Sequence, residues 1–131
     1  MKKLVLCIVS LFMLISLTAC SADNAPSTYI SISAAEAKEL MDSKNGYIIL
    51  DVRTENEFAE GHIPGAILIP DYDIEECAEA MLPDKKQLIL VYCRSGRRSK
   101  NAAAKLAEMG YSNVKEFGGI IDWSYGTTKE S

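Results

Sequence analysis

Residues 88–99, which read LILVYCRSGRRS, decide the fold of this chain. The run 88–92 is continuously apolar or aromatic, which is typical of a strand that is buried on both faces of a parallel sheet. An alanine-rich segment follows at residues 99–109, and its apolar side chains recur at helical spacing up to Gly110, the predicted C-cap. The chain must therefore turn sharply between a strand and a helix, and Gly96 permits the positive φ that such a turn needs.

The same alternation of strand and helix patterns continues on both sides of this stretch. Four further strands are expected, at residues 30–32, 47–50, 66–69 and 114–117. Three further helices are expected, of which two open with the capping boxes Ser33–Glu36 and Thr54–Glu57, and a third is capped by Asp73 with Glu76 and stopped by Pro83. Alternating strands and helices predict right-handed βαβ units. We therefore expect a single α/β domain with a five-stranded, mostly parallel sheet and helices on both faces.

The first 19 residues are predicted to be a signal peptide and not part of the fold. A basic start is followed by an apolar run, residues 4–17, which is shorter than the roughly 20 residues of a membrane-spanning helix. The segment Leu17-Thr18-Ala19-Cys20 resembles the lipobox of bacterial lipoproteins, in which the Cys is lipidated after cleavage. An ordinary signal peptide that is cut near Ala19 and leaves Cys20 as a free thiol is the alternative.

Lipidation of Cys20 would attach the protein to the cell membrane on its extracytoplasmic side, because acyl chains insert into the bilayer. The short polar segment that follows has the composition of a linker. The expected organisation is a lipoprotein signal peptide at 1–19, a lipidated tether at 20–28 and one folded domain at 29–131.

Charge and length limit the classes of function. Without residues 1–19 the 131-residue chain retains 112 residues, which suffices for one core and not for two domains. Removal of Lys2 and Lys3 leaves 12 basic against 18 acidic residues, a net charge of −6. This acidic balance argues against nucleic acid as a partner, and any anion site must be local.

Two of the four cysteines, Cys77 and Cys93, belong to the predicted domain. Neither lies in a CxxC motif or in a cluster with His, so we expect no metal site and no cofactor. The pattern is also not a disulfide framework. An unpaired thiol in an exported protein indicates chemistry.

The loop after the strongest strand gathers the residues that such chemistry needs. Cys93 is followed by three arginines, and successive amides in a tight loop form an anion-binding nest at the N-terminus of the next helix. Positive charge and a helix N-terminus both favour the thiolate form of a cysteine. We expect Cys93 to be the nucleophile, with the substrate-binding residues Arg94, Ser95, Gly96, Arg97, Arg98 and Ser99.

Three ordered motifs in this chain resemble those of the rhodanese family. The first combines Asp51-Val52-Arg53 with Glu57-Phe58 and residues 61–66, GHIPGA. The second is the loop 91–99, and the third is Gly118-Gly119-Ile120 followed by Trp123. The resemblance implies a sulfurtransferase with a single rhodanese-like domain and a five-stranded parallel sheet.

The resemblance also implies a two-step mechanism. The Cys93 thiolate would take the outer sulfur of thiosulfate, polysulfide or a persulfide donor and become a persulfide, and a thiol or cyanide-like acceptor would remove that sulfur. A protein could also be the acceptor. Arg94 and Arg98 are the preferred donor-binding residues, whereas Arg97 is expected to face water. Asp51 and Arg53 are expected to support the site, with a salt bridge between strand and loop as their simplest role.

Other activities remain open on the sequence. Phosphatases and arsenate reductases of the same fold place five residues between Cys and Arg, whereas four separate Cys93 from Arg98, which favours sulfur transfer. A sulfur carrier or sensor module without turnover would need the same cysteine. A thiol redox protein would pair Cys77 with Cys93. His62, the sole histidine, would have to serve any Cys–His hydrolase, but it fits better as a backbone-bonded residue beside its Pro-Gly turn.

Overall fold

The computed structural model describes residues 28–129, so the predicted signal peptide and all but the last residue of the tether lie outside the described residues. The strands are β1 (Ile30–Ser31), β2 (Ile48–Asp51), β3 (Ile67–Leu68), β4 (Ile89–Cys93) and β5 (Val114–Gly119). The helices are α1 (Ala34–Ser43), α2 (Glu55–Glu60), α3 (Ile74–Met81) and α4 (Arg97–Glu108), with short 3₁₀ turns η1 (Asp71–Asp73) and η2 (Ile120–Asp122).

The five strands form one sheet in the order β1-β5-β4-β2-β3, and every neighbouring pair is parallel. The expected α/β fold is therefore confirmed, and the sheet is fully and not mostly parallel. All five residues of β4 are buried, because β4 lies in the middle of the sheet. The residues 88–92 owe their continuous apolar character to this position.

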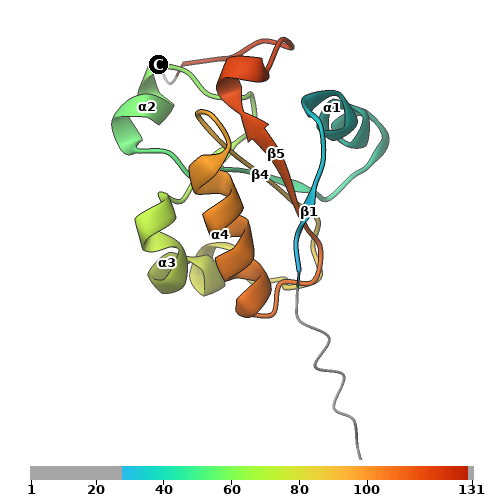
Figure 1. The fold of residues 1–131 in the computed structure, drawn as a ribbon, viewed down its shortest axis with the longest axis vertical. Coiled ribbons are helices and arrows are strands. Elements are labelled where there is room, and N and C mark those ends of the chain that lie inside the picture. Colours follow the sequence, from blue (N-terminus) through green and yellow to red (C-terminus); the bar gives the residue numbers. More distant parts are fainter. Residues whose placement is uncertain (1–27, 130–131) are drawn as a thin grey trace, which may run out of the picture.

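Helices cover both faces of the sheet (Figure 1). Side chains of α3 and α4 pack with Val91 and Cys93 on one face. Side chains of α1 pack with Leu90, Tyr92 and Trp123 on the other face. Successive residues of β4 thus serve two separate cores, as expected for the two-residue period of a strand.

Of the three side-chain caps predicted at helix N-termini, two are present in the structure. Both capping boxes are present, at Ser33 for α1 and Thr54 for α2. The predicted cap of α3 is wrong, because Asp73 makes no side-chain hydrogen bond. The turn η1 leads directly into α3, so its backbone already continues the helix and leaves the Asp73 carboxylate without that role.

One irregularity in the sheet lies beside the loop after β4. Val91 pairs with Glu116 and Cys93 pairs with Gly119, so β5 has one residue more than β4 between the two pairs. This is a β-bulge, a feature that re-aims side chains and is frequent next to active sites.

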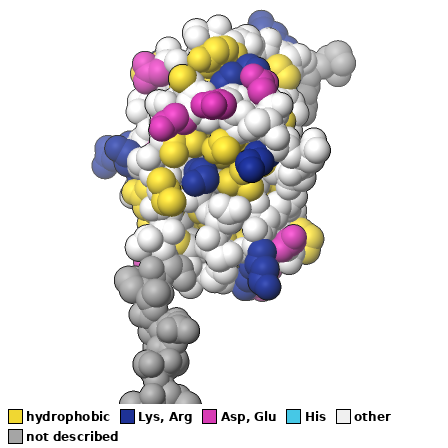
Figure 2. All heavy atoms as spheres, turned by 90° about the vertical axis from the view of Figure 1, so that its right-hand side faces the viewer, with side chains coloured by type: hydrophobic (Ala, Val, Ile, Leu, Met, Phe, Trp, Pro, Cys, Tyr) yellow, Lys and Arg dark blue, Asp and Glu magenta, His cyan; other side chains and the backbone are white. Residues whose placement is uncertain are grey.

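The surface that carries α1 mixes apolar patches with acidic and basic side chains, as the space-filling view of that side shows (Figure 2). Over the described residues, no helix combines the length and the apolar character that crossing a membrane requires.

Candidate active site

Cys93 is the last residue of β4, and it is only 1% exposed. Its Sγ accepts a hydrogen bond from the backbone N–H of Gly96 at 3.0 Å. The thiol donates to Ser99 Oγ at 3.3 Å. The sulfur atom therefore lies inside the turn that joins β4 to α4, at the N-terminal end of that helix, where backbone N–H groups and the helix dipole favour negative charge.

Gly96 makes this turn possible. Its φ is +106°, in the left-handed region, and it is the N-cap of α4. A side chain there would be strained, whereas glycine adopts the conformation freely. The helix begins at Arg97, two residues earlier than predicted, so Arg97 and Arg98 belong to its first turn and not to the loop.

The predicted substrate-binding residues divide by exposure. Arg94, Ser95 and Arg97 are exposed and form the outer rim of the loop. Gly96 and Ser99 are buried, and Arg98 is partly buried. The structure thus brings Cys93, Gly96 and Ser99 into direct contact and leaves Arg94 and Arg97 in solvent.

The loop rests on the bulge of β5. A Cβ atom on Gly119 would come within 2.0 Å of the carbonyl oxygen of Arg94 and 2.5 Å of Ser95 Cα. No side chain can occupy that space, because backbone atoms cannot move away as a flexible side chain would. Gly119 is therefore required for the close approach of the loop to β5.

Glu116 is the residue of this site that sequence reasoning missed. Its carboxylate is 2% exposed and accepts a hydrogen bond from Ser99 Oγ at 2.7 Å. The available signal was an acidic residue, two positions before Gly118, inside a predicted strand of a sheet that was expected to carry helices on both faces. A charged residue is rarely buried without a specific role.

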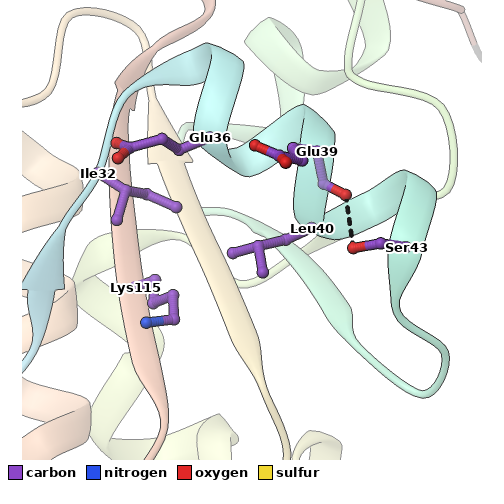
Figure 3. A pocket seen from close by; sticks show the side chains of 6 residues that line it. All are labelled: Ile32, Glu36, Glu39, Leu40, Ser43 and Lys115. Atoms are coloured by element: carbon purple, nitrogen blue, oxygen red, sulfur yellow. Dashed lines mark hydrogen bonds between the residues drawn. The ribbon is translucent and has the colours of Figure 1, made fainter.

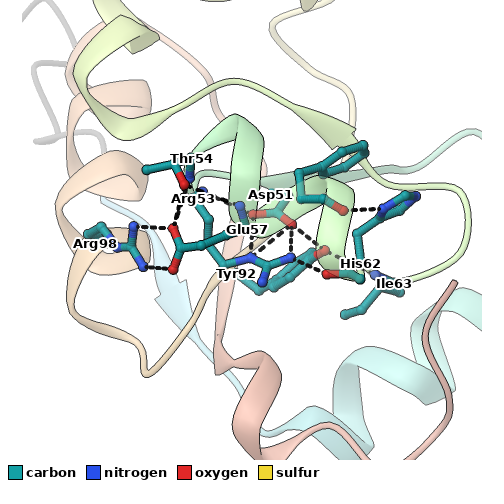
Figure 4. Close-up of polar contacts among 10 residues, drawn as sticks. Asp51, Arg53, Thr54, Glu57, His62, Ile63, Tyr92 and Arg98 are labelled. Carbon is teal, nitrogen blue, oxygen red and sulfur yellow. Dashed lines mark hydrogen bonds and ion pairs between the residues drawn. The ribbon is translucent and has the colours of Figure 1, made fainter. Parts of the chain in front are cut away.

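Arg98 is held by Glu57 across the site (Figure 4). Two parallel hydrogen bonds of 2.8 and 2.9 Å join the guanidinium to the carboxylate. These bonds lower the pKa of Glu57 to about 2, and backbone and side-chain bonds from Thr54 add to the effect. The hydrogen bonds that Arg98 donates to Glu57 likewise raise the pKa of Arg98.

Asp51 and Arg53 form a buried ion pair behind the loop, with 2.7 Å between Arg53 Nη2 and Asp51 Oδ2 (Figure 4). Tyr92 donates its hydroxyl proton to the same Asp51 oxygen at 2.7 Å and accepts from the N–H of Ile63. Burial, followed by the charge of Asp51, raises the pKa of Tyr92. Arg53 also donates to the carbonyl of Gly61. This network fixes the end of β2 against β4 and the segment after α2.

His62 and Cys77 do not take part in the hydrogen bonds of the Cys93 sulfur. His62 Nδ1 is 2.8 Å from the carbonyl oxygen of Phe58, and the two rings stack at 3.7 Å between centroids. Cys77 is partly buried against the core beneath α4, and both Cys77 and Cys93 are free thiols.

A separate hollow of about 290 Å³ lies beside α1 (Figure 3). Its lining residues are Ile32, Glu36, Glu39, Leu40, Ser43 and Lys115. None of them belongs to the loop of Cys93, and the set contains no strong nucleophile, so the candidate chemistry stays with that loop.

Residues 33–125 match the family described as the rhodanese-like domain. The chain belongs to the rhodanese family. The match includes β2, the loop after β4 and the Gly118-Gly119 pair, which are the three regions whose motifs pointed to this family.

Similar proteins carry sulfurtransferase names. The chain is 40% identical over 73 residues to the thiosulfate sulfurtransferase PspE of Escherichia coli, which covers 56% of this chain and 70% of that protein. It is 35% identical over 96 residues to the thiosulfate sulfurtransferase GlpE of Coxiella burnetii, covering 72% of this chain and 87% of that one. The expected enzyme class, a rhodanese-type sulfurtransferase, is thereby confirmed.

Solved structures agree with the fold. An Escherichia coli structure described as rhodanese with anions superposes with a TM-score of 0.61 at 36% identity, covering 64% of this chain and 99% of that one. A rhodanese-like domain protein from Staphylococcus aureus gives a TM-score of 0.66 at 30% identity, covering 78% of this chain and 99% of that one.

Proposed function

We propose that this protein moves a sulfane sulfur from a donor such as thiosulfate, polysulfide or a persulfide to a thiophilic acceptor, and that Cys93 carries the sulfur as a persulfide. The observation that carries the proposal is the hydrogen bond from the N–H of Gly96 to Cys93 Sγ at the start of α4. A sulfur atom in this position can hold negative charge, first as a thiolate and then as a persulfide.

In the first step the Cys93 thiolate attacks the outer sulfur of the donor. A bond forms between Sγ and that sulfur, and the S–S bond of the donor breaks. The remainder of the donor, sulfite in the case of thiosulfate, leaves with the electron pair. Loop amides and the helix N-terminus stabilise the charge that develops on sulfur.

In the second step a nucleophilic acceptor, such as a thiolate or cyanide, attacks the outer sulfur of the persulfide. The bond from that sulfur to Sγ breaks, and Cys93 regains its electron pair. Arg94, Arg97 and Arg98 would favour the approach of anionic donors to an otherwise acidic protein.

The shape of the site supports sulfur over phosphorus. Cys93 is almost fully buried, so a reactant must present a slender atom to Sγ. A terminal sulfane sulfur is such an atom, whereas a phosphate surrounds its phosphorus with oxygens that need a wider ring of amides. The four-residue spacing from Cys93 to Arg98 leaves a small loop.

The test is the intact mass of the purified domain after treatment with thiosulfate. We expect a gain of one sulfur that cyanide removes, together with thiocyanate production over many turnovers. Cys93→Ser should lose both, because oxygen is a far weaker nucleophile toward sulfur, and its circular dichroism should be unchanged. Cys77→Ser is the matched control and should keep both activities.

The result that would contradict the proposal is a gain of sulfur in Cys93→Ser, or robust turnover of an aryl phosphate or arsenate by the wild-type protein. A stable disulfide between Cys77 and Cys93 as the working oxidised form would instead support a thiol redox protein.

A second candidate is a sulfur carrier that loads once and passes sulfur only to a partner protein. A similarity favours it, because the chain is 35% identical over 105 residues to the putative sulfur carrier protein YrkF of Bacillus subtilis. Efficient single-round loading without turnover on cyanide or small thiols would identify the carrier.

We also propose that Cys20 carries lipid and attaches the domain to the extracytoplasmic side of the cell membrane. The support for this is the sequence around residue 20. Sulfur transfer would then take place at a membrane surface.

A further inference from the structure

Glu116 is a buried carboxylate next to Cys93 that the sulfur transfer described above does not use. It lies on β5 opposite Val91. Val91 and Cys93 face α4, and the side chain of Glu116 reaches Ser99 on that helix. The carboxylate therefore lies in the interior of the protein, beneath the first turn of α4.

The partners of Glu116 are all neutral. Oε1 accepts from Ser99 Oγ at 2.7 Å and from the N–H of Gly118 at 2.7 Å, and Oε2 accepts from Ser31 Oγ at 3.1 Å. Within residues 28–129, the ion pairs with N–O distances up to 4.0 Å do not include this carboxylate. A buried charge without a cation is costly. The hydrogen bonds of Glu116 lead through Ser99 to Cys93, a group that can supply a proton.

Ser99 joins the two groups. Its hydroxyl has one proton to donate, and Glu116 Oε1 at 2.7 Å is nearer than the carbonyl oxygens of Gly96 at 3.0 Å and Gly118 at 3.4 Å. The lone pairs of Ser99 Oγ are then free to accept from the thiol of Cys93 at 3.3 Å. The result is a directed chain of hydrogen bonds from the Cys93 thiol through Ser99 to Glu116.

We propose that Glu116 accepts the proton of Cys93 through Ser99 when Cys93 takes up sulfur, an inference that rests on Cys93 being the sulfur acceptor. The thiol proton passes to Ser99 Oγ while the Ser99 proton passes to Glu116 Oε1. The electron pair left on Sγ forms the bond to the outer sulfur of the donor, and the donor remainder leaves with the pair from the broken S–S bond. When the acceptor removes the sulfur, Sγ regains its pair and the proton returns by the same route.

This arrangement keeps one negative charge at the buried site in both stable states. Before loading the charge is on Glu116, and after loading it is on the outer sulfur of the persulfide while Glu116 is neutral. A thiolate or persulfide next to an ionised carboxylate would be two like charges at close range, which disfavours having both groups ionised at once. Glu116 acts through Ser99 and does not touch the donor, so it is a positioning residue and Ser99 is the group in contact with Sγ.

The test is an infrared difference spectrum between the thiosulfate-loaded and the reduced protein at neutral pH. We expect loading to produce the C=O stretch of a protonated carboxyl group, which shifts in D₂O. The band should be absent from Glu116→Gln, because the amide oxygen can accept the bonds from Ser99 and Gly118 but the amide cannot take the proton. Glu108→Gln, which changes an exposed carboxylate on α4, should keep the band.

The variants also separate a proton relay from a purely structural role. Ser99→Ala keeps Glu116 but interrupts the chain, so it should lose the band and load sulfur about a hundredfold more slowly, at the low end of what a positioned acid–base group contributes. Glu116→Gln should show a similar loss of rate. If Glu116→Gln does not fold, the proposal is still tested by the carboxyl band of the wild-type protein, by the shift of that band in D₂O and by the loss of the band in Ser99→Ala.

The outcomes distinguish this inference from the function on which it rests. Sulfur loading of the wild-type protein without a carboxyl band, or wild-type loading rates in Glu116→Gln, would overturn the relay and leave Cys93 as the sulfur carrier. Failure of the wild-type protein to load sulfur at all would overturn the proposed function itself.

Discussion

Arg98 and Glu57 control the charge that a donor meets near Cys93. The two side chains share a bidentate pair, so the positive charge of Arg98 is partly neutralised on one side. Arg97, one residue earlier, is exposed, and its charge is screened by water and salt. Neighbouring arginines on one helix turn are therefore not equivalent.

We predict that Arg98→Ala lowers kcat/KM for thiosulfate by about five- to tenfold, because it removes a partly buried cation and leaves Glu57 unpaired, an effect near the upper end for a solvent-accessible charge. Arg97→Ala should change the same constant by about twofold or less. Steady-state kinetics at constant ionic strength measure both. Equal losses in the two variants would contradict the assignment of Arg98 as the donor-binding residue.

At this scale the sequence pointed to the proposed nucleophile but not to its proposed proton partner. Cys93, Gly96 and Ser99 were predicted together because they are neighbours in one motif. Glu116 is 17 residues from Ser99 in the chain, and it meets Ser99 only because β5 pairs with β4 and bulges at that point. A contact that depends on strand pairing leaves no local pattern.

The pair of Glu57 and Arg98 also connects two elements, since it joins α2 to the first turn of α4. Glu57 in addition caps α2 through Thr54. One carboxylate thus fixes a short helix at its own N-terminus and ties it to the helix that carries the active-site turn.

We predict that this carboxylate contributes to acid stability. Its pKa is about 2 in the folded protein against an ordinary value of 4.5, so the stabilisation is complete above about pH 4.5 and is lost as the pH falls toward 2. Glu57→Gln should lower the free energy of unfolding by about 1–2 kcal/mol at neutral pH, as expected for a charged but partly exposed pair. The deficit should shrink as the pH falls through that range.

Urea unfolding at a series of pH values measures this effect, with Glu60→Gln on the exposed end of the same helix as the control. A deficit that stays constant between pH 4.5 and the acid limit would show that the ionised form of Glu57 is not what stabilises the fold.

Elements were predicted well where local signals are strong. The capping boxes marked α1 and α2, and the apolar run marked β4. The start of α4 was missed by two residues because a left-handed Gly96 with no side-chain bond serves as its N-cap, in place of a residue type that caps by hydrogen bonding. At Asp73 the residue type suggested a cap that the preceding 3₁₀ turn makes unnecessary.

For the whole molecule, alternation of strands and helices predicted the layers of the fold, because a parallel sheet needs a crossover between paired strands. It did not predict the strand order. In the structure β1 joins the sheet beside β5, and α1 packs against the face opposite α4.

The predicted anchor is also a property of the whole chain. We expect the native protein to sediment with membranes and to be released by detergent, since two or more acyl chains hold a protein firmly. Cys20→Ala should move it to the soluble exported fraction with its sulfurtransferase activity intact. A native protein that is soluble and keeps an unmodified Cys20 would show that the anchor prediction is wrong.

The pairing of β1 with β5 has a consequence for how the chain acquires its structure. The hydrogen bond from Ser31 to Glu116 closes a loop of 85 residues, and β5 lies between β1 and the rest of the sheet. Contacts between such distant segments form slowly, because the loop entropy is lost before they stabilise anything. A chain that emerges from a ribosome or a translocation channel with its N-terminus first must hold β1 without its strand partner until residues 114–119 have followed. The sheet is therefore completed at its β1 edge only after β5 has been delivered.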